Sequence, residues 1–418
     1  MNILLKSAKI VDAQNPGLHL KVRDILIKNG TIEKIASKIE PGPRSKVVSF
    51  KNLHVSKGWL DSSVSFGEPG FEERETITNG LKVAGKSGFT DIVLNPNTYP
   101  TPDNSGAIIF LKNAGKAETT ELHPIGSLTL KGEGVDLAEL YDMKNAGAVA
   151  FYDFKHPIMN ANLLKIALQY AHNFDGLVLS FPMNTQIAGN GSVHEGDIST
   201  KLGLQGIPAL AEEIQIARDL FILEYTGGKL HIPTISTENS VRLIREAKKK
   251  GLDVTCSVAL HNLWFSDTIL ENFESNYKVL PPIRTKKDRE ALKKGIKTGT
   301  IDFVTSDHVP IDVEEKRVEF DNAAYGSLGL ENAFGVLNAL FDTETAIELL
   351  TKGRERFNVQ THELKEGAKA NLTLFNPDAP YTFENDHILS TSKNSMYVGE
   401  KLKGKVYGTI AKNALLTS

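Results

Sequence analysis

Short apolar runs alternate with amphipathic stretches over the middle of the chain. Eight of the runs have the length and composition of buried strands, and helical periodicity fills most of the gaps between them. The runs cover 59–65, 90–95, 123–128, 147–152, 177–181, 230–235, 253–258 and 302–307, and the clearest helical patterns cover 72–87, 159–172, 208–226, 237–250 and 285–298. Such alternation predicts parallel strands joined by right-handed crossovers. Eight units in about 300 residues predict a TIM-like (β/α)₈ barrel, an α/β fold, rather than an open sheet.

The two ends of the chain show a different pattern. Both consist of short alternating runs separated by turn residues, such as Asn29-Gly30 near the start and Asn376-Pro377 near the end. We therefore predict that residues 1–56 and 363–418 pair as one small, discontinuous β-sandwich domain. The barrel would then span residues 57–362.

Composition and charge narrow the class of protein. The chain has 418 residues, of which 40% are hydrophobic and 24% charged, as in ordinary globular proteins. Its net charge of −3 gives no general attraction for nucleic acid or an anionic membrane. No apolar run approaches the ~20 residues that span a bilayer, and the lysines near the N-terminus do not fit a signal peptide. We expect a cytoplasmic protein that binds neither nucleic acid nor membrane.

A single cysteine excludes an internal disulfide framework and a cysteine zinc cluster. Cys256 lies inside an apolar run, which predicts a buried packing role.

In a barrel of this kind, functional groups gather at the carboxyl ends of the strands. A zinc site needs three or four imidazole, carboxylate or thiolate ligands, and hydroxyls are poor replacements for imidazole. The only strand-end candidates are Asp153, His261, Asp307 and His308. His231 precedes Thr234 by an odd offset, so we expect it on the other face of its strand, in a second layer or facing a helix.

Asp307 and His308 form the best candidate acid/base pair in the sequence. No Gly-x-Ser-x-Gly elbow is present, and the stretch Gly326 to Gly329 lacks the lysine of a phosphate loop. A structural role for the pair, holding the last strand end, remains open beside a catalytic one.

Several motifs occur together and in order along the chain. They are Gly58-Trp-Leu-Asp61, Glu68-Pro-Gly-Phe-Glu72, Pro96-Asn97-Thr98, His194-Glu-Gly196, Ala211-Glu212, Ser236-Thr237, Pro281-Pro-Ile-Arg284, Ser306-Asp307-His308-Val-Pro310, Gly329-Leu-Glu331 and Ser392-Lys-Asn394. In these the chain resembles the class I dihydroorotases of the cyclic amidohydrolase superfamily over essentially its whole length. The resemblance implies a TIM-like barrel with a small β domain, a homodimer, and a zinc-activated water that opens a cyclic amide.

The resemblance also implies where the family's functional residues would fall. The two strand-1 histidines fall on Ser63 and Ser65, the substrate arginine on Gly67, and the later histidine ligands on Ser180 and Thr234. An Asp-Asp pair becomes Asp153-Phe154, an asparagine becomes Leu280 and a histidine becomes Ile311. What survives is Asn97 as a substrate contact, Asp307 as metal ligand and general base, and His308. We therefore expect no high-affinity metal site and no cofactor, although active relatives use zinc.

Three functions remain open on this basis. The first is a non-catalytic homologue that assembles with aspartate transcarbamoylase in pyrimidine synthesis. The second is a still active dihydroorotase or other cyclic-amide hydrolase that uses Asp307 and His308, including a single-metal site on Asp153 and Asp307. The third is a binding module for a small ligand that retains Asn97.

Overall fold

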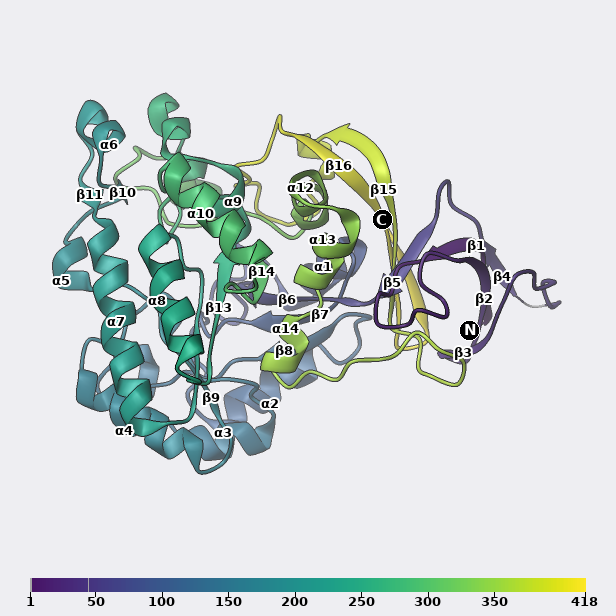
Figure 1. Ribbon diagram of the computed structural model, residues 1–418, viewed down its shortest axis with the longest axis horizontal. Helices are drawn as coiled ribbons and strands as arrows, with labels where there is room; N and C mark the ends of the chain where they lie inside the picture. Colours follow the sequence, from purple (N-terminus) through teal and green to yellow (C-terminus); the bar gives the residue numbers. More distant parts are fainter. Residues whose placement is uncertain (1, 44) are drawn as a thin grey trace.

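A closed ring of parallel strands occupies the middle of the chain in the computed structural model, which describes residues 2–43 and 45–418 (Figure 1). One three-stranded sheet has the order β6-β7-β8, and one four-stranded sheet has the order β9-β12-β13-β14. Single parallel bridges from Phe151 to Gly126 and Val178 join the sheets on one side, and a bridge from Val64 to His308 joins them on the other. The strands are β6 (Trp59–Val64), β7 (Phe89–Leu94), β8 (Glu121–Pro124), β9 (Leu177–Leu179), β12 (Lys229–Ile232), β13 (Val254–Ala259) and β14 (Phe303–Thr305).

The predicted barrel is thus confirmed, with one local difference. The run 147–152 provides only the bridges at Phe151 instead of a full strand. Gly147 ends the preceding helix in the left-handed conformation, with φ of 109°.

Helices cover the outside of the ring, and the five predicted helical patterns are all found. Short excursions between them carry β10 (Val193–His194), β11 (Gly206–Ile207) and four 3₁₀ turns, Leu130–Gly132, Asp267–Asn272, Ser275–Tyr277 and Asn385–His387. The helices are α1 (Ile77–Lys86), α2 (Ser105–Ala114), α3 (Leu140–Ala146), α4 (Ala161–His172), α5 (Thr185–Ala188), α6 (Asp197–Leu202), α7 (Ala209–Thr226), α8 (Glu238–Lys249), α9 (Leu260–Trp264), α10 (Lys286–Lys297), α11 (Val313–Lys316), α12 (Ala333–Leu340), α13 (Thr343–Leu349) and α14 (Gly353–Arg356).

Helix α8 shows why the sequence forms these elements. The Thr237 hydroxyl accepts from the Ser240 amide and caps the N-terminus. Val241, Ile244 and Ala247 recur at helical spacing and are buried against the sheet. Lys248 lies in the last turn, where positive charge is favourable, and its ammonium binds Asp302.

Both ends of the chain build a second domain around one sheet, at the right of Figure 1, where the first and last colours of the sequence meet. The sheet has the order β17-β16-β15-β5-β1-β2-β3, with β4 on β1. Apolar side chains from β3 and β16 share one core cluster, so the sheet curves around its own interior. The strands are β1 (Asn2–Ile10), β2 (Val22–Lys28), β3 (Thr31–Ala36), β4 (Lys46–Val48), β5 (His54–Lys57), β15 (Leu372–Thr382), β16 (Lys401–Ala411) and β17 (Ala414–Thr417). The domain boundaries at 56/57 and 362/363 stay predictions.

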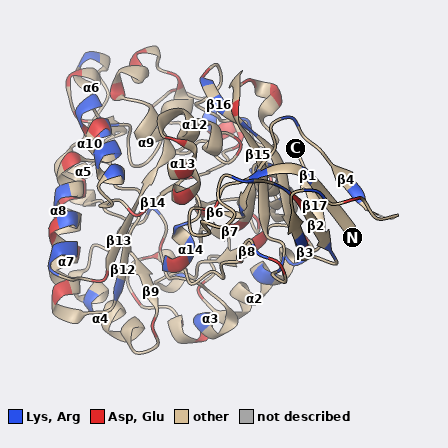
Figure 2. Ribbon diagram, turned by 45° about the vertical axis from the view of Figure 1, so that its right-hand side comes forward, with Lys and Arg blue, Asp and Glu red and all other residues tan. Residues whose placement is uncertain are grey.

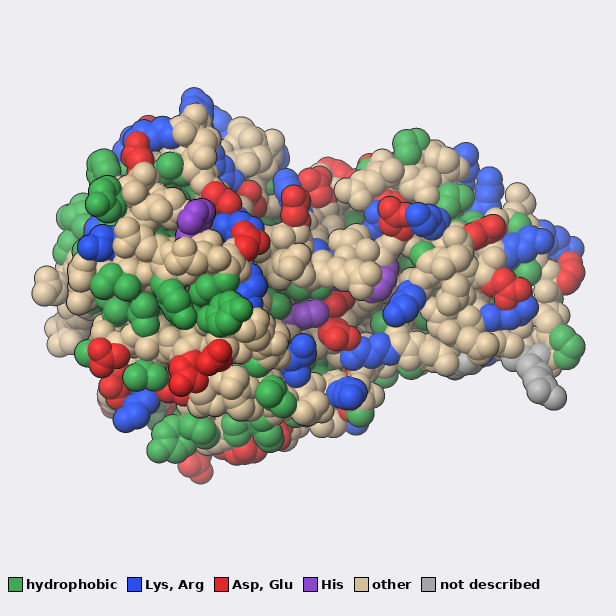
Figure 3. Space-filling model, turned by 90° about the horizontal axis from the view of Figure 1, so that it is seen from below, with side chains coloured by type: hydrophobic (Ala, Val, Ile, Leu, Met, Phe, Trp, Pro, Cys, Tyr) green, Lys and Arg blue, Asp and Glu red, His purple; other side chains and the backbone are tan. Residues whose placement is uncertain are grey.

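The outer surface is mixed in charge. Basic and acidic residues both lie along α7, α8 and α10 (Figure 2). The face formed by α2, α3 and α4 instead carries hydrophobic side chains on the barrel half (Figure 3); these helices expose Ile109, Phe110, Tyr141, Ile166 and Tyr170. Over residues 2–43 and 45–418, no helix is long and apolar enough to cross a membrane.

Candidate functional site at the carboxyl ends of the strands

The first and last barrel strands meet at Asp61, and this contact positions the rest of the site. The Asp61 carboxylate is fully buried and accepts from the Thr305 hydroxyl at 2.5 Å and from the Ser306 amide at 3.0 Å. Burial raises the pKa of Asp61, although these donors oppose the shift. Asp61 therefore closes the ring and fixes the strand ends that follow it, Ser63 and Asp307.

The two strand-1 serines are tied to each other through Asn95, at the end of β7. The Asn95 amide donates to Ser63 Oγ at 3.1 Å and to Ser65 Oγ at 3.2 Å. Ser63 Oγ in turn donates to Asp307 Oδ1 at 3.2 Å. All four residues are buried. Asn95, the two serines and Asp307 thus form one buried hydrogen-bonded chain.

A lysine occupies the other side of Asp307. Lys155 Nζ lies 2.8 Å from Asp307 Oδ2, and the two side chains are only 11% and 2% exposed. The ammonium also lies over the Phe154 ring, 5.3 Å from its centroid. Asp307 is therefore held by a cation from the chain and by a serine hydroxyl.

Asp153 faces away from Asp307. Its Oδ1 accepts from the Ser127 hydroxyl and from the amides of Leu128 and Thr129 at 2.8–2.9 Å, and its Oδ2 accepts from the Thr129 hydroxyl at 2.5 Å. Burial raises the pKa of Asp153, although these donors oppose the shift. Asp153, which the family resemblance places as a bridging metal ligand, thus holds the loop after β8.

Ser180 and Thr234 are likewise engaged in local contacts. Ser180 Oγ donates to Asp219 Oδ2 on α7 at 2.6 Å, and burial raises the pKa of Asp219 to about 6. The Thr234 amide donates to Ser257 Oγ, which also contacts His231 Nε2 at 3.1 Å. His231 stacks on Phe303 inside the barrel, so the second-layer expectation fits and the helix-facing alternative was wrong. β12 ends at Ile232 and Thr234 is left-handed with φ of 50°, so the alternation of the strand does not extend to Thr234.

Several buried polar atoms around the strand ends have no protein partner. They are Asn97 Oδ1, His261 Nε2, His308 Nε2 and Tyr397 Oη. Burial lowers the pKa of His261 to about 4 and that of His308 to about 4, so both imidazoles are neutral at pH 7. His308 Nδ1 accepts from the amides of Gly329 and Leu330, so its ring holds that loop. No hydrogen bond joins His308 to Asp307 among the described residues.

The position that corresponds to the substrate arginine could not carry a side chain without rearrangement. Gly67 has φ of 120°, and a Cβ there would lie 2.5 Å from the carbonyl oxygen of Phe71. A side chain at this position therefore requires both a strained backbone and a displaced loop.

The motif residues that the chain keeps form a scaffold beside the strand ends. Glu212 Oε1 accepts from the Ser236 and Thr237 amides and from the Ser240 hydroxyl. Arg284 donates to Ser236 Oγ at 3.0 Å, to the Ile207 carbonyl at 2.7 Å and to His194 Nδ1 at 3.1 Å. These buried contacts join α7, α8, β11 and the segment before α10, which assigns a structural role to His194.

The side chains present do not fit a metal ion. Over residues 2–43 and 45–418, no group of three or more His, Cys, Asp or Glu side chains could hold one. Asp307 is paired with an ammonium, Asp153 is bonded to the segment 127–129, and Ser63 and Ser65 both accept from the Asn95 amide. Cys256 is buried in β13, as predicted, and its thiol cannot contribute at the strand ends.

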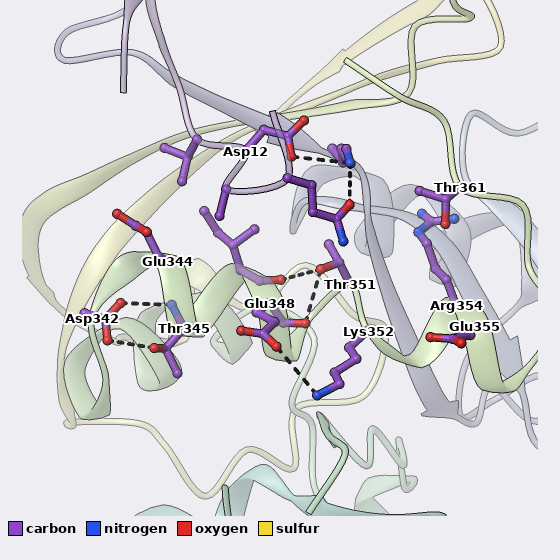
Figure 4. Close-up of a pocket in the computed structure, with 15 residues that line it drawn as sticks. Asp12, Asp342, Glu344, Thr345, Glu348, Thr351, Lys352, Arg354, Glu355 and Thr361 are labelled. Atoms are coloured by element: carbon purple, nitrogen blue, oxygen red, sulfur yellow. Dashed lines mark hydrogen bonds and ion pairs between the residues drawn. The ribbon is translucent and has the colours of Figure 1, made fainter. Parts of the chain in front are cut away.

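A cavity of about 640 Å³ lies at the opposite end of the barrel (Figure 4). It is bounded by Asp12 and Lys57 of the β-sheet domain and by α13 and α14, including Glu348, Lys352 and Arg354. These charged side chains are largely paired with one another, as the Lys352–Glu348 contact in Figure 4 shows. The cavity contains none of the strand-end residues described above.

Comparison with known proteins assigns the family. The fold is that of the hydantoinases: an L-hydantoinase (dihydropyrimidinase) from Arthrobacter aurescens covers 100% of the chain with a TM-score of 0.86 at 20% identity, and 96% of that protein is matched. A D-hydantoinase structure gives a TM-score of 0.84, also at 20% identity, over 100% of the chain and 95% of its own.

Comparison at the level of sequence identifies the family. A family model described as "Dihydro-orotase-like" matches residues 54–240. The dihydroorotase of Syntrophus aciditrophicus is 36% identical over 100% of the chain and 99% of its own length, and that of Pelotomaculum thermopropionicum is 37% identical over 98% and 97%. The chain therefore belongs to the dihydroorotase family.

Three contributors to the site were missed from the sequence. They are Asn95, Lys155 and Tyr397, none of which is among the site residues predicted from the sequence. Lys155 follows Asp153 by two residues at a strand end, and that position was a usable signal. Tyr397 gave none, because it reaches the site from the C-terminal part of the chain, after β15.

Proposed function

We propose that this chain is a non-catalytic dihydroorotase homologue of pyrimidine biosynthesis, which supports aspartate transcarbamoylase as an assembly partner. The single observation that carries the proposal is the state of Asp307. This carboxylate, the remaining base candidate, is paired with the Lys155 ammonium and the Ser63 hydroxyl. Both of its oxygens are therefore engaged by groups of the chain itself, which leaves neither oxygen free to bind a metal ion.

The state of the substrate position supports the same proposal. Recognition of a small carboxylate favours an arginine, whose planar fork binds both oxygens. Gly67 offers no such group, and its backbone leaves no room for one. The hydrogen bonds of Glu212 and Arg284 hold helices and loops of the barrel together. They support a role that depends on the folded barrel and not on catalysis.

The test of lost catalysis combines metal analysis with a hydrolysis assay. The purified protein should contain less than one-tenth equivalent of zinc and should open dihydroorotate no faster than buffer, with an intact family member as the positive control. The rate of dihydroorotate hydrolysis with the variant Asp307→Asn should equal that with the unmodified protein. Turnover that depends on Asp307 would contradict the proposal.

The test of partnership uses the transcarbamoylase of the same organism. Sedimentation of the mixture should show a complex, and removal of this chain should change the transcarbamoylase activity or its assembly. Separate sedimentation and unchanged activity would rule the partnership out. In the absence of a partner, we propose that the chain forms a homodimer, which sedimentation of the protein alone would also show.

A second candidate is an active dihydroorotase, and one observation favours it. Its relatives at 36–37% identity over nearly the full length carry that name. In that case Asp307 would act with Asn97 as a substrate contact, and His308 would have to leave the Gly329–Leu330 loop. The hydrolysis assay above separates the two candidates.

A further inference from the structure

We propose that the Lys155 ammonium takes the place of a bound metal ion, supplying from the chain itself the positive charge beside Asp307 and excluding divalent cations from the strand ends. The inference rests on the proposed loss of the metal centre but is independent of any partner. It concerns a contact between two residues that the sequence places 152 positions apart.

The ion pair satisfies an electrostatic requirement of this site. A buried carboxylate without a counter-charge is costly, and removal of one partner from a buried pair is strongly destabilising. Asp307 is 3% exposed, and its two oxygens accept from Lys155 and Ser63. No other cationic side chain among the described residues is bonded to it. The stability of this strand end therefore depends on Lys155.

The chain geometry separates the two residues that flank Phe154. Phe154 is left-handed, with φ of 52°. Asp153 before it faces the segment 127–129, whereas Lys155 after it reaches Asp307. A carboxylate position and a cation position thus follow each other closely in sequence but face different partners.

The same arrangement disfavours the binding of a divalent cation at Asp307. An ammonium has three donors and no lone pair, so it cannot be a ligand. A divalent ion at Asp307 would have to displace it or lie beside a like charge. Asp153 offers no second carboxylate, because four donors already hold it.

A double-mutant cycle on thermal stability tests the ion pair. Lys155→Met and Asp307→Asn should each lower the melting temperature by several degrees, whereas the double variant should lose clearly less than the sum of the two. Asn tolerates the left-handed conformation of Asp307, so the second change removes charge with little backbone effect. The matched control is the exposed pair Lys201–Glu271, whose cycle should be additive. Additive losses at positions 155 and 307 would overturn the proposal.

A metal titration tests exclusion. The variant S63H/S65H places two imidazoles next to Asp307, and it is compared with S63H/S65H/K155A. Chelator competition should give a zinc dissociation constant at least tenfold lower once Lys155 is removed. Equal affinities would overturn the exclusion.

The outcomes also separate this inference from the proposed function. Tight zinc binding by the unmodified protein, together with coupling in the cycle, would overturn the loss of the metal centre and the exclusion of divalent cations, and would leave only the ion pair standing. No zinc and no coupling would overturn the ion pair alone.

Discussion

The hydroxyls of Ser63 and Ser65 are hydrogen-bonded in a way that small side chains make possible. Ser63 and Ser65 share one amide donor, Asn95, because two hydroxyls fit within reach of one carboxamide. Two imidazoles at these positions would be larger and would need other partners. Serine at these two positions thus allows both hydroxyls to share one buried hydrogen-bond donor.

Asp91 gives a pH-dependent prediction. Burial disfavours the ionised form, but the hydrogen bond from His123 and the charge of Arg354 outweigh this and hold the pKa of Asp91 well below its usual range. A lowered folded pKa contributes stability that is present above the unfolded pKa, ~4, and is lost progressively as the pH falls below it.

We expect Asp91→Asn to cost ~3–5 kcal/mol at pH 7, because it leaves Arg354 buried without its counter-charge. Urea unfolding at pH 7 and pH 3 should show a smaller difference from the unmodified protein at pH 3. A difference that stays constant or grows toward low pH would contradict the assignment.

At the residue scale, the sequence could identify a residue but not what it contacts. Asp307 and Asn97 were found because their motifs are local. Lys155 was overlooked because its partner lies on another strand, and a lysine at a strand end is ordinary in isolation. The direction of Asp153 depends on the left-handed Phe154, which no local pattern indicated.

At the scale of elements, residues of the retained motifs form hydrogen bonds that connect helices and loops. Arg284 connects the segment before α10 to β11 and to the turn before α8. We expect Arg284→Met to destabilise the protein by ~3–5 kcal/mol, because Glu212 keeps a buried charge without its cation.

The control for this prediction is Arg242→Met, which breaks an exposed pair with Glu246 on α8. It should change the free energy of unfolding by less than ~0.5 kcal/mol. Both free energies are measured by urea unfolding at pH 7. Similar losses of stability for the two variants would contradict the structural role of Arg284.

The loop around α11 carries a second pH-dependent element. The Lys316 ammonium donates to the carbonyls of Lys278 and Ala324, and burial lowers its pKa to about 7. The unfolded chain therefore binds a proton that the folded chain does not, between pH 7 and ~10.5, so stability should rise with pH over that window. Lys316→Met should flatten this rise in thermal melts recorded from pH 7 to 9.5.

Element prediction succeeded where periodicity was strong. The five helical patterns were found with shifted ends, because capping residues such as Thr76 decide where the first turn begins. The run 147–152 was read as a strand from its apolar residues alone. Only Phe151 of this run pairs with its neighbours, and an apolar composition does not indicate which of its residues form backbone bridges.

At the scale of the whole molecule, the two domains share structural contacts. Trp59 begins the first barrel strand and packs on Phe334 of α12 and Phe375 of β15. The Thr373 hydroxyl donates to the Gly88 carbonyl at 2.6 Å. We expect one cooperative thermal transition in calorimetry, since β15 also lies in the middle of the terminal sheet.

Truncation after residue 371 should abolish this transition, because it removes β15, β16 and β17 and leaves β5 unpaired on one side. Two separate transitions in the full chain would show instead that the domains unfold independently. The overall architecture was predictable because strand–helix alternation and strand-rich ends are global patterns. The chemistry of the strand ends was not, since it depends on contacts across the closed ring.

The left-handed residues at the strand ends have a further consequence. Phe154, Thr234 and Asp307 all hold a conformation that costs roughly 1–3 kcal/mol for a residue other than glycine. In a catalyst such strain is maintained by selection for activity, whereas the non-catalytic role proposed above gives no reason to keep it. Laboratory evolution toward heat resistance should therefore accept glycine or asparagine early at 154 and 234, while position 307 stays fixed by its lysine. Substitutions at the left-handed positions 154 and 234 are then a route to higher stability.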